Sequence, residues 1–193
     1  MKGLVVFIMS KVYIFLADGF EEIEGLTVVD MLRRADIDIE MVSISDRLDV
    51  VGGHQIIVKA DMLFEDADFS DADMLVLPGG KVGTDNLTAH EGLDSLLKDF
   101  NAKGKLLAAI CAAPSVLGKK GLLKGRKAIC YPGFEDYLLG ASITNEAVVS
   151  DGNIITSKGM GTAIDFSLEI IKRLKTGEDA EKIASSIQYQ YYK

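Results

Sequence analysis

The sequence predicts an α/β protein built on a doubly wound, mostly parallel sheet. Short apolar runs recur along the chain with helix-like segments between them, and this βαβ order is typical of a parallel sheet. Most of the runs are continuously apolar rather than alternating, which indicates strands covered on both faces. Helices are therefore expected on both sides of the sheet.

Length and composition favour one domain. The chain has 193 residues, of which 48% are hydrophobic and 26% charged, as in an ordinary globular protein. The net charge of −8, with no basic patch, argues against a nucleic-acid partner. We expect a single domain over 1–193 with its core at about 11–175. Residues 1–8 form an N-terminal extension if Met9 is the natural start, and the sequence leaves Met1 and Met9 both open.

The apolar N-terminus is interpreted as the start of the core rather than a membrane anchor or signal peptide. Lys11 interrupts the run, no small-residue cleavage site follows it, and the run is too short to cross a bilayer. No membrane partner is expected. The only cysteines, Cys111 and Cys130, do not make a disulfide framework, which favours a reducing cytoplasm.

The remaining elements follow in order along the chain. The expected strands are 12–16, 39–44, 74–77, 106–110, 128–130 and 154–157, and the expected helices are 21–35, 91–103, 112–120 and 162–175. The tail 178–193 has Ile183 and Ile187 at helical spacing and predicts a last helix. Gly52-Gly53 and Asp151-Gly152 each separate two short apolar runs, as in a β-hairpin.

Four loops are expected at the carboxyl edge of the sheet, where open parallel sheets hold their ligands. They are "ADGFEEIE", "LPGGKVG", "ICAAP" and "TSKGMGTA". Gly79, Gly80, Gly159 and Gly161 would let backbone N–H groups approach a ligand closely, although loop geometry alone explains any single glycine.

Cys111 follows an apolar strand and precedes a helix start, a place that presents a side chain on a sharp turn. Its neighbours Ala109, Ala112 and Ala113 are small enough for such a turn. The helix N-terminus is expected to lower the pKa of the thiol and make it reactive. The alternative is a buried cysteine that acts as a small hydrophobe, and this is the interpretation of Cys130.

Three acidic residues open the first helix, where the helix dipole favours negative charge. Glu24 shares its flank with Val28 and Met31, which predicts a partly buried carboxyl with a raised pKa, suited to proton transfer. Periodicity alone does not choose Glu24 over Glu21. Glu21 and Glu22 are assigned to the solvated first turn.

The chain has two histidines, and neither adjoins Cys111 in sequence. His90 precedes a helix and is interpreted as a surface or capping residue. His54 lies in the first hairpin, where a surface position and an approach to the active site both stay open. No metal-ligand spacing stands out, so no metal is expected.

Taken together, these motifs resemble the DJ-1/ThiJ/PfpI superfamily, in its DJ-1-like branch. The resemblance runs from about Lys11 to Leu174 and rests on "LADGFEEIE", "VVDMLRRA", "DADMLVLPGG", "AAICAAPSVL" and "TSKGMGTAIDF", in this order. It implies a flavodoxin-like, glutamine-amidotransferase-like three-layer sandwich, a homodimer and no cofactor.

The resemblance also implies the roles of the site residues. Cys111 matches the family's nucleophilic, oxidation-sensitive cysteine, and Glu24 matches the carboxylate that hydrogen-bonds its sulfur. The oxyanion-hole amides match Gly80, next to Gly79 in "PGG", and Ala112.

One departure from the family pattern bears on the reaction. Many relatives have a histidine directly after the cysteine or on the strand after the elbow helix, where this chain has Ala112 and Tyr131. A cysteine–histidine dyad does not carry over, which argues against peptidase activity. Tyr131, His54 and Gly159 are placed in the pocket around the cysteine.

Two functions remain open. The first is a glyoxalase III or deglycase-type enzyme whose partner is a small aldehyde, such as methylglyoxal, or a glycated substrate. The second is a redox sensor or chaperone with an oxidisable Cys111. Both need the same residues. A thiamine-pathway role has no support in the sequence.

Overall fold

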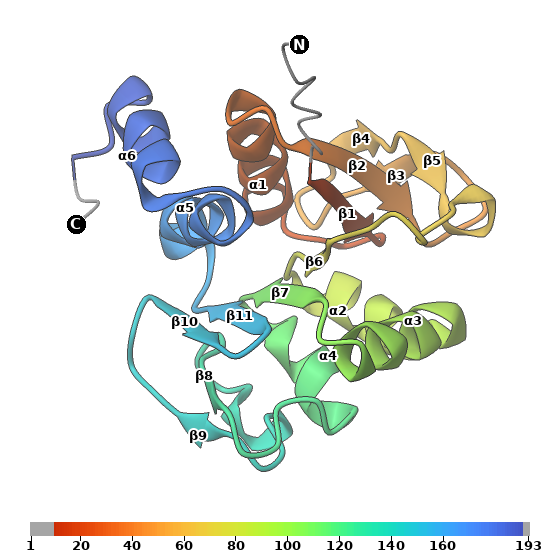
Figure 1. Ribbon diagram of the computed structural model, residues 1–193. Helices are drawn as coiled ribbons and strands as arrows, with labels where there is room; N and C mark the ends of the chain where they lie inside the picture. Colours follow the sequence, from red (N-terminus) through yellow and green to blue (C-terminus); the bar gives the residue numbers. More distant parts are fainter. Residues whose placement is uncertain (1–9, 191–193) are drawn as a thin grey trace, which may run out of the picture.

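The computed structural model describes residues 10–190 and is centred on a seven-stranded sheet in the order β10-β11-β7-β6-β1-β2-β5 (Figure 1). Neighbouring strands are parallel except β10 and β11, which are antiparallel. The strands are β1 (Lys11–Leu16), β2 (Asp38–Ser43), β5 (Met62–Leu63), β6 (Met74–Leu77), β7 (Leu106–Ile110), β10 (Val148–Asp151) and β11 (Ile154–Ser157). The predicted mostly parallel α/β fold is confirmed.

Helices cover both faces of this sheet (Figure 1). On one face lie α1 (Glu22–Arg34), α5 (Ala163–Leu174) and α6 (Gly177–Ser186), and on the other α2 (Lys81–Ala89), α3 (Glu91–Ala102) and α4 (Pro114–Lys119). Short 3-10 turns cover Phe64–Asp66, Glu135–Tyr137 and Met160–Thr162. Between residues 10 and 190, no helix has the length and apolar character needed to cross a bilayer.

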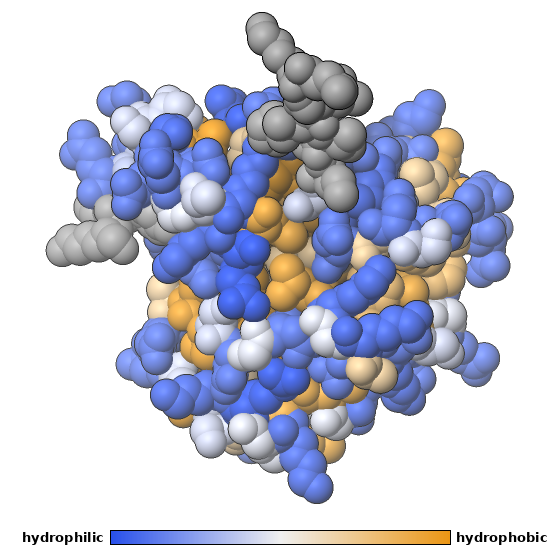
Figure 2. Space-filling view, in the orientation of Figure 1, coloured by the Kyte–Doolittle hydropathy of each residue, from blue (hydrophilic) through white to orange (hydrophobic). Residues whose placement is uncertain are grey.

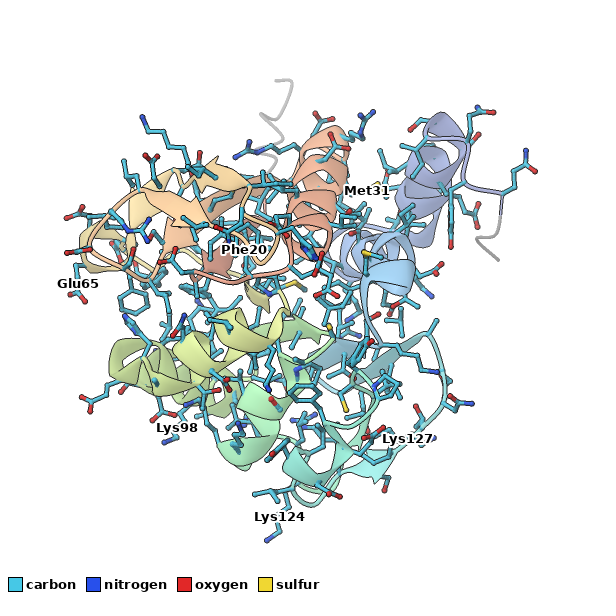
Figure 3. The ribbon with its side chains drawn as sticks, turned by 180° about the vertical axis from the view of Figure 1, so that it is seen from behind. Phe20, Met31, Glu65, Lys98, Lys124 and Lys127 are labelled. Atoms are coloured by element: carbon cyan, nitrogen blue, oxygen red, sulfur yellow. The ribbon has the colours of Figure 1, made fainter. Side chains whose placement is uncertain are left out.

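Two separate apolar clusters explain why the central strands are continuously apolar. Along β1, Val12 and Ile14 pack into the cluster beneath α1 and α5, whereas Tyr13 and Phe15 pack into the cluster above α3. Met31 lies on the side of α1 that faces α5 and α6 (Figure 3). On the face shown in Figure 2, polar and charged residues cover most of the periphery, and hydrophobic residues are visible in a central band.

Both predicted hairpins are confirmed. The first joins β3 (Asp49–Val51) to β4 (Ile57–Lys59), and the second joins β10 to β11. Gly152 turns the second hairpin with a φ of +61°, a left-handed conformation that glycine adopts without strain. The first hairpin turns through Gly52–Ile56 and folds back over the start of α1, where Gly53 N–H donates to the Phe20 carbonyl over 2.8 Å.

The structure contradicts one predicted element and adds others that were not predicted. The 128–130 segment is not a core strand: β8 (Lys127–Ala128) pairs only with β9 (Ser142–Ile143), and Ile129 N–H donates to the Thr156 hydroxyl instead of a strand carbonyl. Helix α2 was not predicted, and its first residues lie within the predicted loop "LPGGKVG". The short edge strand β5 was not expected. The extension at 1–8, the choice of start and residues 191–193 of the predicted last helix lie outside the described residues, and α6 ends at Ser186.

The order of the strands in the sheet determines where a ligand-binding site is expected. The chain leaves β1 toward β2 and then returns to the other side of β1 as β6, so the order reverses between β1 and β6. Open α/β sheets bind ligands beyond the carboxyl ends of the strands at such a reversal. The loops after β1, β6, β7 and β11 meet there.

Candidate active site

Cys111 lies on the predicted sharp turn between β7 and α4. Its φ is +64°, a conformation uncommon for a residue with a side chain. Two backbone hydrogen bonds hold it: Cys111 N–H donates to the Ser157 carbonyl over 2.9 Å, and Tyr131 N–H donates to the Cys111 carbonyl over 2.7 Å. The turn is therefore fixed from both sides, by β11 and by the segment after β8.

Glu24 brings a buried carboxyl to this sulfur. Its side chain comes from the first turn of α1, the residue is 1% exposed, and Oε2 accepts a hydrogen bond from Gly79 N–H over 2.9 Å. The carboxyl also hydrogen-bonds the Cys111 thiol and the backbone of Met160. A side chain at Gly79 would collide with both Glu24 Oε2 and the Cys111 side chain, so only glycine fits between them.

Burial raises the pKa of Glu24 to about 7, as the sequence predicts. Burial, followed by the charge and hydrogen bond of Glu24, raises the pKa of the Cys111 thiol to about 12. The expected lowering of the thiol pKa is wrong, because burial of the thiol and then the adjoining Glu24 carboxyl outweigh the hydrogen bonds that favour the thiolate. The two groups titrate as a pair that holds one proton between about pH 7 and pH 12. A thiolate forms when that proton lies on Glu24.

Two backbone amides face the same sulfur. The N–H groups of Gly80 and Ala112 hydrogen-bond Cys111 and act to lower its pKa, against the larger effects of burial and Glu24. Gly80 has a φ of +87°, and a side chain there would collide with the Gly19 carbonyl. Donors fixed in this way are suited to hold negative charge on sulfur or on an oxygen bonded next to it.

A cavity of about 460 Å³ opens over the pair. The predicted pocket residues His54 and Tyr131 line it, and Tyr131 is half exposed. The sequence also places Gly159 in the pocket, but Gly159 does not line this cavity. It packs against the Tyr131 ring, where an added Cβ would be 3.2 Å from Tyr131 Cδ2. The full lining is Glu21, Glu24, His54, Gly80, Lys81, Cys111, Ala112, Tyr131, Phe134 and Met160.

Four lining residues were not predicted: Lys81, Phe134, Met160, and Glu21, which the sequence assigns to the solvated first turn. Lys81 and Met160 lie inside loops that the sequence does mark, "LPGGKVG" and "TSKGMGTA", whereas Phe134 has no local signal. A larger hollow of about 570 Å³, over α1 and α5, is lined by no cysteine or histidine. Reactive side chains thus favour the smaller cavity as the active site.

Glu22 corrects another prediction, since it is not solvated. The residue is 3% exposed; Oε1 accepts from His54 N–H over 2.7 Å, and Oε2 lies 2.9 Å from His54 Nδ1. Burial alone would raise the pKa of Glu22, but these bonds and further backbone bonds outweigh it and lower the pKa below its usual value.

Among the described residues, one set of side chains has a geometry that suits a metal ion, and it includes Glu22 and His54. Ligand atoms of Glu21, Glu22 and His54 lie within 4.8 Å of one another. Both oxygens of Glu22 already accept hydrogen bonds from His54, so hydrogen bonding accounts for the cluster.

Two other sequence interpretations concern residues away from the cavity. His90 caps α3, as predicted, because its Nδ1 accepts from Leu93 N–H over 3.0 Å. Cys130 is 1% exposed and packs in the apolar cluster on the opposite side of the sheet from the cluster that Cys111 borders. The two thiols therefore lie in different environments.

The fold and this elbow define a class of α/β proteins with a nucleophile at a strand-to-helix turn. A family model described as "DJ-1/PfpI family" matches residues 10–173, and the chain belongs to that family. The structure of oxidized Toxoplasma gondii DJ-1 is 37% identical, superposes with a TM-score of 0.91, and covers 94% of this chain and 100% of that one. This similarity confirms the flavodoxin-like sandwich.

Curated relatives differ in length. Protein DJ-1 homolog B of Arabidopsis thaliana is 36% identical over 180 residues, which are 92% of this chain and 41% of that protein. The chain thus spans less than half the length of this relative. A Pyrococcus abyssi protein named a deglycase is 31% identical over 167 residues, which are 86% of this chain and 99% of that protein.

Proposed function

We propose that the protein is a cysteine-dependent, cofactor-free enzyme that acts on methylglyoxal or its early adducts, in the manner of glyoxalase III or a deglycase. The observation that carries the proposal is the hydrogen-bonded Glu24–Cys111 pair beneath a cavity, with two amides facing the sulfur. The name of the Pyrococcus abyssi relative supports the same chemistry.

The first step is addition of sulfur to the aldehyde carbon. The Cys111 thiolate forms an S–C bond, and the carbonyl π pair moves to oxygen, which the amides of Gly80 and Ala112 stabilise. The oxygen takes the proton held by Glu24, which gives a hemithioacetal and leaves Glu24 as a carboxylate. A pKa of about 7 makes Glu24 able to give and take a proton near neutral pH.

The second step moves hydrogen within the bound substrate. Glu24 removes the proton from the carbon bonded to sulfur, a carbon–carbon double bond forms, and the π pair of the neighbouring carbonyl moves to its oxygen. The proton then returns from Glu24 to that second carbon, while the hydroxyl proton of the first carbon is transferred to the second oxygen and the thioester carbonyl forms. The product is a thioester of a 2-hydroxy acid. Water then adds to the thioester and the thiolate leaves, so methylglyoxal and water become lactate without any external oxidant or reductant.

Turnover of methylglyoxal to lactate in thiol-free buffer tests the proposal. Purified wild-type protein is expected to form lactate, and folded Cys111→Ser to form none. Equal rates in the two proteins would show that the reaction does not use this site.

A redox-sensing role is the second candidate, and the same two amides favour it. They would also bind the oxygens of a sulfinate on Cys111, while protonated Glu24 would donate to it. One similar structure is described as oxidized DJ-1. Selective oxidation of Cys111 in a protein that lacks turnover would support this role. Family resemblance leads us to propose a homodimer and a cytoplasmic location as well, which light scattering and cell fractionation test.

A further inference from the structure

The first hairpin carries His54 to the rim of the cavity that contains Cys111. Gly19 N–H donates to the Val51 carbonyl over 2.7 Å and Gly53 N–H to the Phe20 carbonyl over 2.8 Å, so the hairpin is fixed on the segment that leads into α1. Phe20, labelled in Figure 3, lies just before the N-terminal end of α1. His54 and Cys111 line the same cavity although they come from different elements.

Glu22 determines which way the His54 ring is turned. The Glu22 carboxylate only accepts hydrogen bonds, so the Nδ1 atom at 2.9 Å must carry the proton. Nε2 is then the ring atom left for another partner, as an acceptor in the neutral ring and a donor in the charged one. A buried carboxylate that fixes an imidazole in this way is a common means of orienting an acid–base histidine.

This ring contact is not needed to hold the hairpin. The backbone N–H of His54 already bonds Glu22 Oε1 over 2.7 Å, and a side chain at Gly52 would collide with Glu22, so the backbone alone encloses the carboxylate. The His54 side chain is 68% exposed and adds little buried area. The main effect of the bond between Nδ1 and Glu22 is therefore to fix the direction in which Nε2 points.

The surroundings favour the protonated ring. The hydrogen bond to Glu22, followed by the charges of Glu21 and Glu22, raises the pKa of His54 above 6.5. Glu21 Oε1 lies 3.7 Å from Nδ1. The other titratable groups of the cavity are Glu24 from α1, Lys81 from α2, Cys111 after β7 and Tyr131 after β8.

We propose that His54, oriented by Glu22, is a second proton-transfer residue of this cavity and acts on the substrate carbonyl next to the carbon that Cys111 attacks. The inference rests on the proposed aldehyde chemistry and assigns it substrates with two adjacent carbonyl groups. Glu22 is a positioning residue, since it acts through His54.

The proton count of the second step shows what His54 supplies. While Glu24 removes the proton from carbon, the π pair of the neighbouring carbonyl moves to its oxygen, which takes the proton from Nε2 of the charged ring. The hydroxyl group on the carbon bonded to sulfur then gives its proton to the neutral His54 ring, and the thioester carbonyl forms. His54 ends the step charged again, and no other proton donor is required.

Two measurements test the inference. Turnover of methylglyoxal by wild-type protein is expected to fall at alkaline pH as His54 loses its proton, and His54→Gln should lose that alkaline limb and about 100-fold or more in kcat, with KM little changed. Glu22→Gln should move the alkaline limb to lower pH. Because the chain has only two histidines, NMR titration resolves both rings, and the pKa of His54 should fall in Glu22→Gln.

His90→Asn is the matched control, because asparagine also caps helices and His90, which caps α3 and packs against Phe64, does not line the cavity. Its pH profile should equal that of the wild type. If the wild type is active, Cys111→Ser is inactive and His54→Gln keeps both kcat and the alkaline limb, this inference is wrong while the proposed function stands. A wild type without turnover would overturn both. An unmoved His54 titration in Glu22→Gln would refute the positioning role of Glu22.

Discussion

Replacing Glu24 by glutamine separates proton transfer from the structural role of this carboxyl. Glutamine has nearly the same size, and its amide can still accept from Gly79 N–H and donate toward Cys111. It cannot give or take a proton in the reaction. We therefore expect Glu24→Gln to keep the fold and the cavity but to lose turnover.

The kinetic loss should be large. With a pKa of about 7, roughly half of the Glu24–Cys111 pairs have lost the first proton at pH 7, so both the acid and the base form are populated. General acid–base catalysis contributes about 100- to 10,000-fold, which corresponds to about 3–5 kcal/mol of transition-state stabilisation. Glu24→Asp should also lose activity, because the shorter side chain withdraws the carboxyl from the sulfur.

Unlike the activity, the stability of the folded Glu24→Gln variant should not decrease at pH 8. Raising the pKa from 4.5 in the unfolded chain to about 7 in the 1%-exposed site corresponds to about 3 kcal/mol as an upper estimate. The folded state binds more protons in this interval, so this contribution is fully present below pH 4.5 and is lost as pH rises to about 7. Glutamine does not ionise, so Glu24→Gln should unfold with a flatter pH dependence and be no less stable than wild type at pH 8.

The assay is lactate formation from methylglyoxal at pH 7, with urea unfolding of the same preparations at pH 5 and pH 8. Glu91→Gln, on the exposed first turn of α3, is the matched control and should change neither measurement. Near-normal turnover by folded Glu24→Gln would refute the mechanism. A protein that is inactive and also less stable at pH 8 would show that the carboxyl is structural.

Three further outcomes are expected. Mild peroxide should add oxygen to the Cys111 peptide and not to the Cys130 peptide, because only the first thiol borders a cavity; equal modification by mass spectrometry would contradict this. Gly79→Ala should lose activity and about 1–3 kcal/mol of unfolding free energy, because its Cβ collides with the carboxyl–thiol pair, whereas Gly177→Ala meets no atom within 4 Å and should lose neither. Glu22→Ala should cost about 1–3 kcal/mol in urea unfolding, since it leaves the partly buried N–H groups of the hairpin without their acceptor; an unchanged midpoint would refute that role.

The sequence predicts the sheet well because local signals and burial agree there. Continuous apolar runs occur where alternate residues enter different clusters, as Val12 and Tyr13 do. Helix α2 was missed because Gly83, Thr84 and Asn86 favour helix weakly, and packing against the rest of the fold decided its conformation. The 128–130 segment is as apolar as a strand, but it packs on the face of β10 and β11 and pairs only with β9, which no local pattern reports.

Among the candidate site residues, Cys111 and Glu24 had local signals. The small residues around the cysteine indicate a sharp turn, and the spacing of Glu24 with Val28 and Met31 indicates burial. Glu22 had none, because the hairpin that buries it lies 32 residues away along the chain. The direction of the Cys111 pKa was missed for a related reason: it depends first on the burial of the thiol and then on Glu24, and both arise only in the folded protein.

The two buried glutamates of α1 show how one helical turn serves two sites. Residues two positions apart on a helix point to different sides. Burial raises the pKa of Glu24 to about 7, because its hydrogen bonds do not offset the loss of solvation, whereas at Glu22 the hydrogen bonds from the hairpin outweigh burial and the pKa falls. Environments that push the pKa values of nearby carboxyls apart divide acid–base roles between them. A change in the hairpin should therefore alter His54 and Glu22 while leaving the Glu24–Cys111 pair intact, and a change at Gly79 should do the reverse.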